Sequence, residues 1–269
     1  MGTIAARTAE FRRLHEAGCF VMPNPWDVGS ARLLAGMGFA ALATTSAGFA
    51  WTTGKPDNTL TLDEALAHLQ LVAAATHAPL NADFQNGYAL DPGDLVENVT
   101  RACGTGIAGL SIEDYSGDPA APLLEFDFAV ERIRAARAAI DDSGTGVVLT
   151  ARTEGFVWDQ PDLDEAIRRL VAFAEAGADC LYVPRITSHH DVAAVVSAVA
   201  PKPVNLLVNK PFITAAQAAE LGVRRISTGG VLARTAWKAF LAAAGELARD
   251  GTVSGFVDLP DVDALLSAP

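Results

Sequence analysis

The sequence predicts an α/β protein built as one parallel (β/α)8 barrel of the TIM type. Short apolar segments typical of buried strands alternate with helix-like segments about eight times along the 269 residues. No Pro/Gly/Ser-rich linker interrupts this alternation, so we expect residues 1–269 to form a single domain. A helical extension is expected from about residue 231. A doubly wound open sheet is the alternative architecture, because the same alternation also fits it.

The expected strands are short, apolar and bounded by glycine, proline or polar residues. They cover residues 19–24, 39–45, 80–83, 108–113, 147–151, 180–184, 203–209 and 224–227. The expected helices cover residues 5–17, 28–38, 62–76, 92–104, 127–140, 163–176, 191–199, 215–221 and 232–249. Thr61 and Glu64 have the spacing of a capping box, and Pro92 stands where helices tolerate proline.

The composition limits the classes of partner. The chain is 50% hydrophobic and has a formal net charge of -12, which disfavours binding to nucleic acid or to an anionic membrane. No apolar run reaches the roughly 20 residues that span a bilayer, and residues 1–15 lack the apolar centre of a signal peptide. Three cysteines without paired or metal-ligand spacing suit a reduced, cytoplasmic protein.

Polar side chains follow the expected strands at the ends that form the active-site face of a parallel barrel. Asp83 and Glu113 each end an apolar run, and Arg152 ends another. The full set at these ends is Asn24, Trp26, Asp27, Ser46, Ala47, Gly48, Asp57, Asp83, Gln85, Asn86, Glu113, Asp114, Arg152, Glu154, Arg185, Asn205, Asn209, Ser227 and Thr228. Carboxylates and amides without histidine or cysteine favour Mg²⁺ or Mn²⁺ over zinc, and Arg152 suits an anionic ligand.

Each of these residues also has a purely structural interpretation. Asp83 could cap a turn, and Arg152 could be the partner in a structural ion pair. The segment 46–48 could be a tight turn, although the N–H groups of such turns also bind carboxylates. Asp27 is expected to cap a helix, and His189 with His190 to lie on the surface at a helix start.

Taken together, the motifs are more specific than any one of them. They are Asn24-Pro25-Trp26-Asp27, Thr45-Ser46-Ala47-Gly48, Ala82-Asp83 ahead of Gly87-Tyr88, Ile112-Glu113-Asp114, Ala151-Arg152-Thr153-Glu154, Val204-Asn205-Leu206-Leu207-Val208-Asn209 and Arg224-Arg225-Ile226-Ser227-Thr228-Gly229-Gly230. In this order they resemble the isocitrate lyase/phosphoenolpyruvate mutase superfamily from Phe20 to about Phe240.

The resemblance implies a Mg²⁺-dependent (or Mn²⁺-dependent) lyase that makes or breaks a C–C bond beside a small 2-oxo or 2-hydroxy carboxylate, through an enolate-like intermediate held on the metal. It implies metal binding by Asp83 and Glu113, with Asp57 in the outer shell, and a clamp on the substrate by Arg152. Ser46, Ala47 and Gly48 resemble the turn that binds the substrate carboxylate. The strand-end residues Trp26, Arg185 and Asn205 complete the expected substrate contacts, and metal-bound water or Tyr88 is expected to move the proton.

One segment departs from the family pattern. The lyases carry a Lys-Cys-Gly-His type segment after the position of Glu113 and Asp114, whereas residues 114–124 contain no Lys, Cys or His. The chain thus resembles a subgroup without the loop cysteine, and we expect residues 114–124 to form a mobile lid that mainly shields the site. Three alternatives stay open: a C–P enzyme of the phosphonopyruvate hydrolase or phosphoenolpyruvate mutase kind, a decayed carboxylate-binding protein, and a Schiff-base aldolase using Lys210.

The resemblance also implies a homo-oligomer, because family members exchange their last helices between subunits and form tetramers. Trp237 and Phe240 on the last long helix, and Phe256 and Leu265 beyond it, fit such an interface. The alternative is that this helix closes its own barrel.

Overall fold

The computed structural model describes residues 3–267 and contains one sheet of eight parallel strands. The strands are β1 (Phe20–Met22), β2 (Leu42–Ala43), β3 (Leu80–Asp83), β4 (Gly109–Glu113), β5 (Val148–Arg152), β6 (Cys180–Tyr182), β7 (Val204–Leu207) and β8 (Arg225–Ser227). Their order in the sheet is β1-β8-β7-β6-β5-β4-β3-β2, with every pair parallel.

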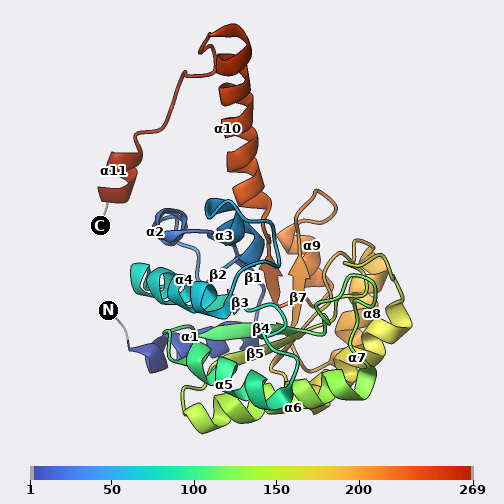
Figure 1. Cartoon of the computed structure of the whole chain (residues 1–269). Helices are drawn as coiled ribbons and strands as arrows, with labels where there is room; N and C mark the ends of the chain where they lie inside the picture. The colour runs from blue at the N-terminus through green and yellow to red at the C-terminus, as the bar shows by residue number, and fades with distance from the viewer. Residues whose placement is uncertain (1–2, 268–269) are drawn as a thin grey trace.

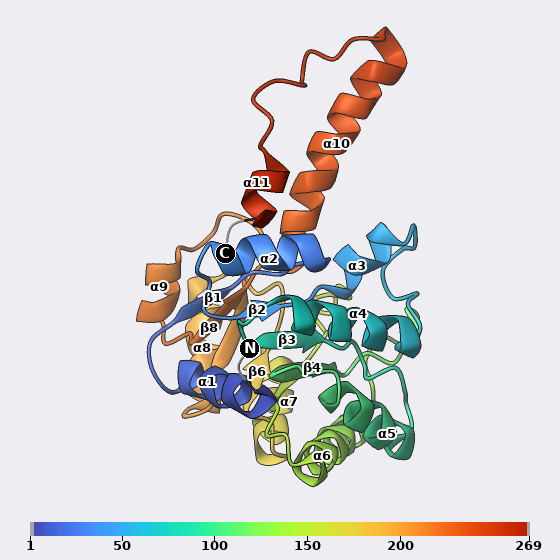
Figure 2. The same ribbon diagram turned by 90° about the vertical axis from the view of Figure 1, so that its left-hand side faces the viewer.

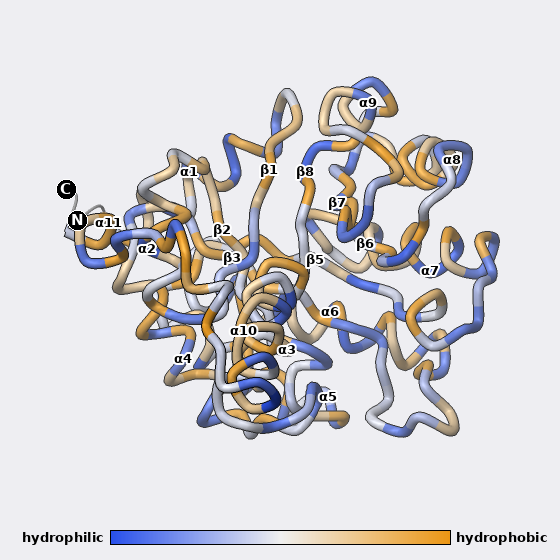
Figure 3. The backbone as a smooth tube through the Cα atoms, turned by 90° about the horizontal axis from the view of Figure 1, so that it is seen from above, coloured by the Kyte–Doolittle hydropathy of each residue, from blue (hydrophilic) through white to orange (hydrophobic). Residues whose placement is uncertain are grey.

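The two ends of this order meet. The amide of Ala43 in β2 donates to the carbonyl of Pro23, directly after β1, over 3.1 Å. Seen from above, the helices surround the strands (Figure 3). The predicted (β/α)8 barrel is therefore confirmed, and the open sheet is excluded.

Helices follow the strands around the barrel (Figure 1). They are α1 (Ile4–Glu16), α2 (Val28–Gly36), α3 (Ser46–Thr52), α4 (Leu62–Ala75), α5 (Pro92–Cys103), α6 (Phe126–Ser143), α7 (Leu163–Glu175), α8 (His189–Val199), α9 (Ala215–Glu220), α10 (Val231–Asp250) and α11 (Val262–Ser267). The predicted capping box of Thr61 and Glu64 is present, and Asp27 caps α2 as predicted. α3 was not predicted as a helix.

The hydrophobic core lies between the strands and the helices. Alternate strand residues such as Leu110, Leu149 and Leu206 are fully buried in this layer. The residues between them line the inside of the barrel, and many of these are polar: Asn81, Asp83, Ser111, Glu113, Thr150, Arg152, Asn205, Arg225 and Ser227. A barrel interior is usually filled by branched apolar side chains, so this polar filling marks the inside as functional.

The C-terminal part departs from the barrel. α10 projects away from the strands, and only Ala233 among its residues is buried (Figure 1). α11 returns to pack beside α2, where Arg32 donates to the carbonyl of Leu266 over 2.8 Å (Figure 2). Among the described residues, no helix combines the length and apolar character needed to cross a membrane.

Candidate active site

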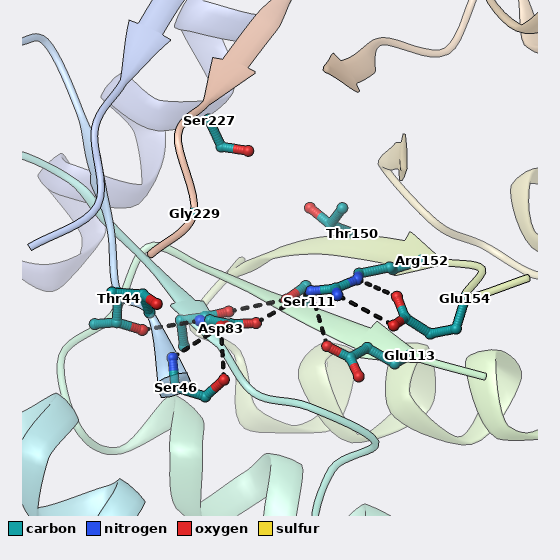
Figure 4. Close-up of polar contacts among 12 residues, drawn as sticks. Thr44, Ser46, Asp83, Ser111, Glu113, Thr150, Arg152, Glu154, Ser227 and Gly229 are labelled. Atoms are coloured by element: carbon teal, nitrogen blue, oxygen red, sulfur yellow. Dashed lines mark hydrogen bonds and ion pairs between the residues drawn. The ribbon is translucent and has the colours of Figure 1, made fainter. Parts of the chain in front are cut away.

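Arg152 lies at the C-terminal end of β5 with three carboxylates around its guanidinium. Its Nη1 lies 2.8 Å from Glu113 Oε1 and 3.5 Å from Asp83 Oδ1. Its Nε and Nη2 both donate to Glu154, the latter over 3.2 Å. Figure 4 shows the three carboxylates directed at the one guanidinium. A guanidinium held by carboxylates on both sides has little freedom to rotate, so its orientation is fixed.

The sheet register explains this meeting. β3, β4 and β5 are neighbours, and Glu113 is paired directly with Arg152 across the β4–β5 ladder. Side chains of paired residues in parallel strands point to the same face. The side chains of Asp83, Glu113 and Arg152 thus meet at these strand ends, while their predicted roles stay a prediction.

Asp83 is also held from the opposite side, by the start of α3. Ser46 donates to Asp83 Oδ2 through its amide and its hydroxyl, each over 2.9 Å. The same hydroxyl lies 3.4 Å from Asp57 Oδ1. Thr44 fixes the backbone of Asp83 by accepting its N–H over 2.9 Å. Ser46 therefore links the two acids, Asp57 and Asp83.

The segment 46–48 is not the free turn that the sequence predicts. It is the first turn of α3, where the Ser46 amide binds Asp83 and the Gly48 amide donates to the Thr45 hydroxyl. A Cβ on Gly48 would lie 2.9 Å from the Cβ of Trp26, so the glycine permits close packing. The backbone N–H groups of Ser46 and Gly48 are therefore engaged within the protein.

The acids outnumber the cation. Burial raises the pKa of Glu113 well above its usual range and also raises those of Glu154 and Asp57, and neighbouring carboxylates add to each effect. Burial alone would lower the pKa of Arg152, but the charges of Glu113 and Glu154 outweigh it and raise that pKa. The site thus gathers the carboxyl groups of Asp57, Asp83, Glu113 and Glu154 around one guanidinium, and the raised pKa values mean that an added cation would stabilise their ionised forms.

The donor chemistry fits a hard divalent cation such as Mg²⁺. Asp83 and Glu113 present carboxylate oxygens, and Mg²⁺ commonly takes one or two protein carboxylates and keeps several waters. Over residues 3–267 no three His, Cys, Asp or Glu side chains share metal-like spacing. The fit therefore rests on two acids and solvent, and not on a protein cage.

Asp114 is buried behind these residues and joins three elements. It accepts from the Thr153 hydroxyl over 2.7 Å and from the Glu154 amide over 2.8 Å. Arg169 of α7 lies 3.1 Å from the same carboxylate and donates to the carbonyl of Leu124 over 2.9 Å. Asp114 therefore fixes the loop after β5, which carries Glu154, and is more than a loop cap.

The segment 114–124 forms a small hairpin over this corner. Tyr115 and Leu123 form an antiparallel bridge, and the Ser116 amide donates to the Pro122 carbonyl over 2.8 Å. The Tyr115 ring stacks on Trp158 at a centroid distance of 4.6 Å. The segment thus has a defined arrangement, while its role as a mobile lid stays a prediction.

A cavity of about 50 Å³ lies at the mouth and centre of the barrel. It is lined by Met22, Asn24, Ala43, Thr44, Asn81, Asp83, Ser111, Arg152, Tyr182, Asn205, Arg225, Ser227 and Gly229. Tyr182 and Arg225 were missed by the sequence reasoning, which stopped at the residues after each strand. The alternation within the strands was the available signal, because it places both side chains inside the barrel.

Other predicted residues lie elsewhere or are already engaged. Trp26 lines a separate cavity beside α10, together with Trp237 and Phe240. Arg185 is exposed and donates to the Val157 carbonyl over 2.9 Å. Asn205 is buried, and both ends of its amide are bonded to neighbouring side chains. None of these three side chains contacts Arg152.

Tyr88 lies close enough to the acids to feel their charge. Its ring packs edge-on against Phe84, with centroids 5.2 Å apart. Burial raises the pKa of Tyr88 far above its usual range, and the charges of Asp83 and Glu113 raise it further. Its hydroxyl is therefore a weaker acid than that of an ordinary tyrosine, and like it stays protonated at neutral pH.

The sequence matches the family model of phosphoenolpyruvate phosphomutase over residues 11–248. An oxaloacetate decarboxylase of Paraburkholderia xenovorans (strain LB400) is 32% identical over 267 residues, covering 92% of this chain and 85% of that protein.

Two solved structures extend the comparison. A Burkholderia cenocepacia J2315 protein provisionally described as a lyase/mutase is 44% identical, with a TM-score of 0.95 over 99% of this chain and 98% of that one. A 2,3-dimethylmalate lyase of the PEP mutase/isocitrate lyase superfamily is 29% identical, with a TM-score of 0.88 over 99% of this chain and 95% of that one. Both the sequence and the fold thus lead to one assignment: the chain belongs to the phosphoenolpyruvate phosphomutase family, within the PEP mutase/isocitrate lyase superfamily.

Proposed function

We propose that the protein is a divalent-metal-dependent lyase that cleaves or forms a C–C bond in a small 2-oxo or 2-hydroxy carboxylate. The observation that supports this most directly is the Arg152 guanidinium, preset by Asp83, Glu113 and Glu154 at the barrel mouth. The similarity to an oxaloacetate decarboxylase and to a 2,3-dimethylmalate lyase supports the substrate class.

Arg152 supplies the anion contact in this proposal. The bond that breaks joins the carbon next to the carbonyl carbon to its outer neighbour. The electron pair of this bond passes toward the carbonyl oxygen, which becomes negative as an enolate forms. A guanidinium already held in place stabilises that charge without reorganising. Glu113 and Glu154 keep the fork oriented, and Ser46 keeps Asp83 turned toward it.

Asp83 and Glu113 would hold the metal ion, with Asp57 placed beside them through Ser46. A bound Mg²⁺ or Mn²⁺ would supply Lewis acidity toward substrate oxygens and offset the excess of carboxylate charge. The hairpin 114–124 would exclude water from the site.

The carbon that loses its bond must regain a proton. Residues 114–124 contain no Lys, Cys or His, so the hairpin lacks the usual donors. We assign the proton transfer to the hydroxyl of Tyr88, which lies close enough to Asp83 and Glu113 for their charges to raise its pKa. A tyrosine hydroxyl carries its proton at neutral pH already at its ordinary pKa of about 10, and the raised pKa keeps Tyr88 protonated beside the acids.

A C–P bond reaction is the second candidate, because the matching family model is that of phosphoenolpyruvate phosphomutase itself. The Schiff-base alternative loses support, because Lys210 is exposed after β7 and lacks the desolvation that activates a nucleophilic lysine.

The deciding experiment is a substrate panel of 2-oxo acids, 2-hydroxy diacids and phosphonopyruvate, assayed with Mg²⁺ or Mn²⁺ and with EDTA. We expect turnover of a 2-oxo or 2-hydroxy diacid that EDTA abolishes and added Mg²⁺ restores. Turnover of phosphonopyruvate alone would favour the C–P reaction. Binding of these acids with no turnover of any of them would indicate a carboxylate-binding protein.

A further inference from the structure

Four polar side chains form an in-register row across the inside of the barrel. Arg152 of β5 pairs with Tyr182 of β6, Tyr182 with Asn205 of β7, and Asn205 with Arg225 of β8. Paired residues of parallel strands point the same way, and all four line the central cavity. The row therefore connects the proposed substrate clamp to a second arginine deeper in the barrel.

Arg225 is 1% exposed and binds three neutral groups. Its Nε donates to Asn205 Oδ1 over 2.8 Å, its Nη2 to Thr150 Oγ1 over 2.9 Å, and its Nη1 to His15 Nε2 over 3.2 Å. Within the described part of the chain, none of the ion pairs includes it. A buried guanidinium without a carboxylate is costly, so packing alone does not account for it.

His15 is fixed as a neutral acceptor for this arginine. Because a guanidinium only donates, His15 Nε2 must accept, and the ring hydrogen lies on Nδ1, 2.7 Å from the Phe11 carbonyl. Burial and the charge of Arg225 lower the pKa of His15 to about 3. Arg225 is thus anchored from α1 as well as from the strands.

The contacts of Arg225 determine how the next residue in the row is turned. Asn205 Oδ1 accepts from Arg225, so its Nδ2 must face the other way, where it donates to Ser227 Oγ over 2.9 Å. The amide cannot flip without losing both bonds. Asn205, the cross-strand neighbour of Tyr182, is therefore fixed in orientation.

Tyr182 is the surface on which Arg152 rests. The Tyr182 side chain is buried, and the Arg152 guanidinium lies 5.2 Å from its ring centroid. At this distance a ring face attracts a cation, so the position of the ring restricts the position of the fork. Glu113 and Glu154 hold the opposite edges of the same fork.

We propose that Arg225 is a positioning residue for Arg152, acting through the in-register row Asn205 and Tyr182. It does not reach the substrate. Its guanidinium fixes Thr150 and also Asn205, the cross-strand neighbour of Tyr182. Through this neighbour it restricts the position of the Tyr182 ring, over which Arg152 lies. The loss of activity expected when Arg225 is replaced rests on the proposed function, whereas the expected change in the position of Arg152 does not.

The test follows the side-chain Nε–Hε signal of Arg152 by ¹⁵N NMR of the full chain, with the signal identified by its loss in Arg152→Lys. In Arg225→Gln we expect this signal to shift or to broaden beyond detection. We also expect kcat/KM to fall about 10–100-fold on any substrate found, because small displacements of a positioned group cost that much.

Arg137→Gln is the matched control. Arg137 pairs with Asp179 and Asp141 away from the row, so its loss removes a guanidinium but should leave the Arg152 signal unchanged. If Arg225→Gln does not fold, Asn205→Ala cuts the row at its centre while keeping Arg225, and the same change in the signal is expected.

An unchanged Arg152 signal in folded Arg225→Gln, or in Asn205→Ala, would overturn the proposal, as would an equal change in Arg137→Gln. If the wild-type protein turns over nothing in the panel, the proposed function fails, but the NMR comparison still tests the positioning role.

Discussion

At the scale of single residues, Asp83 combines several contacts with exposure to solvent. It accepts two hydrogen bonds from Ser46 and lies against Arg152, yet its side chain is still 19% exposed toward the barrel mouth. A carboxylate that is held but open to solvent can bind a ligand with little cost to the fold. Its replacement should therefore separate metal binding from stability.

We predict that Asp83→Asn lowers Mg²⁺ affinity by about 10–100-fold and removes metal-dependent activity, while the melting temperature changes little. Titration calorimetry with Mg²⁺ alone measures the first effect without a substrate. Asp63→Asn is the control, because Asp63 is an exposed acid paired only with Arg101. Unchanged Mg²⁺ affinity in Asp83→Asn would refute the metal assignment.

The burial of His68 leads to a prediction about how the stability of the protein depends on pH. It stacks on Phe49 at a centroid distance of 3.8 Å, and burial lowers its pKa to about 4. The unfolded chain, with an ordinary histidine pKa of about 6.5, takes up the proton first as the pH falls. The contribution of His68 to stability is therefore complete above about pH 6.5 and is lost toward pH 4, at up to about 1.4 kcal/mol per pH unit.

Chemical denaturation of wild type and His68→Gln between pH 7 and 4.5 measures this. Comparing the two proteins cancels the titration of the carboxylates, some of which have raised pKa values and act in the opposite direction. The stability difference should shrink as the pH falls. A constant difference would show that His68 is not buried as a neutral ring.

The residues of the candidate site differ in how far the sequence alone predicts them. Asp83, Glu113 and Arg152 could be predicted because each ends an apolar run, and parallel strands bring those ends together. The alternation within β8 could have placed Arg225 inside the barrel, but its role could not be predicted, because that role depends on side chains of β5, β7 and α1. Partners distant in sequence leave no local pattern.

At the scale of elements, Asp114 and Arg169 join β4, the loop after β5 and α7. The side chains of this ion pair are 1% and 7% exposed. Removing one partner leaves the other as an uncompensated buried charge. The pair should therefore be among the strongest local contributions to stability.

We predict that Arg169→Met lowers the free energy of unfolding by about 3–5 kcal/mol, measured by urea denaturation. Arg168→Met is the neighbouring control, since Arg168 is half-exposed and pairs with Glu165 at the surface. Its effect should stay near 0–1 kcal/mol. Equal effects of the two substitutions would contradict the structural role of Asp114.

The hairpin 114–124 makes a prediction about mechanism. Tyr115 is 7% exposed and stacks on Trp158, so we expect its ring, and not its hydroxyl, to be what the hairpin contributes. Tyr115→Phe keeps the ring and should leave kcat within a few-fold of wild type. A general acid or base would contribute about 10²–10⁴-fold to kcat. A loss of that size would therefore show that the Tyr115 hydroxyl takes part in proton transfer.

Elements also show where local patterns were misleading. The segment 46–48 was predicted as a turn because Ser, Ala and Gly suit turns, but Thr45 caps a helix through the Gly48 amide. The helix continues to Thr52 because Phe49 packs on His68 of α4. Tertiary contacts decide between a turn and a short helix, and the sequence window does not contain them.

At the scale of the molecule, alternation of strands and helices predicted the class of fold, and the resemblance predicted the superfamily. Closure could not be read from periodicity. The closure of the barrel depends on the short strand β2 and on the backbone hydrogen bond from Ala43 to Pro23, two residues that lie 20 positions apart in the sequence. An open sheet and a closed barrel share the same local sequence patterns. They differ in whether the two end strands of the sheet, here β1 and β2, meet.

α10 leads to the last prediction, which concerns assembly. The helix projects from the barrel, which argues against its closing its own barrel beyond the first turn (Figure 1). Phe240 is 58% and Leu241 62% exposed, and an open groove of about 710 Å³ lies between Trp51 and the part of the helix that carries Trp237 and Leu241. The apolar residues continue past the helix in Val253, Phe256, Val257 and Leu259.

So large an exposed apolar surface is unusual for a monomer, so we predict a homo-oligomer that buries it, with a tetramer built from helix-exchanged dimers as the expected form. Light scattering at micromolar concentration should give a mass well above the 28.0 kDa of one chain. Phe240→Glu should shift the mass toward the monomer, because it places a charge in the interface. Leu71→Glu is the control, since Leu71 is a 62% exposed leucine on α4, and it should leave the assembly intact. A 28.0 kDa species in the wild type would contradict the prediction, whatever the variants do.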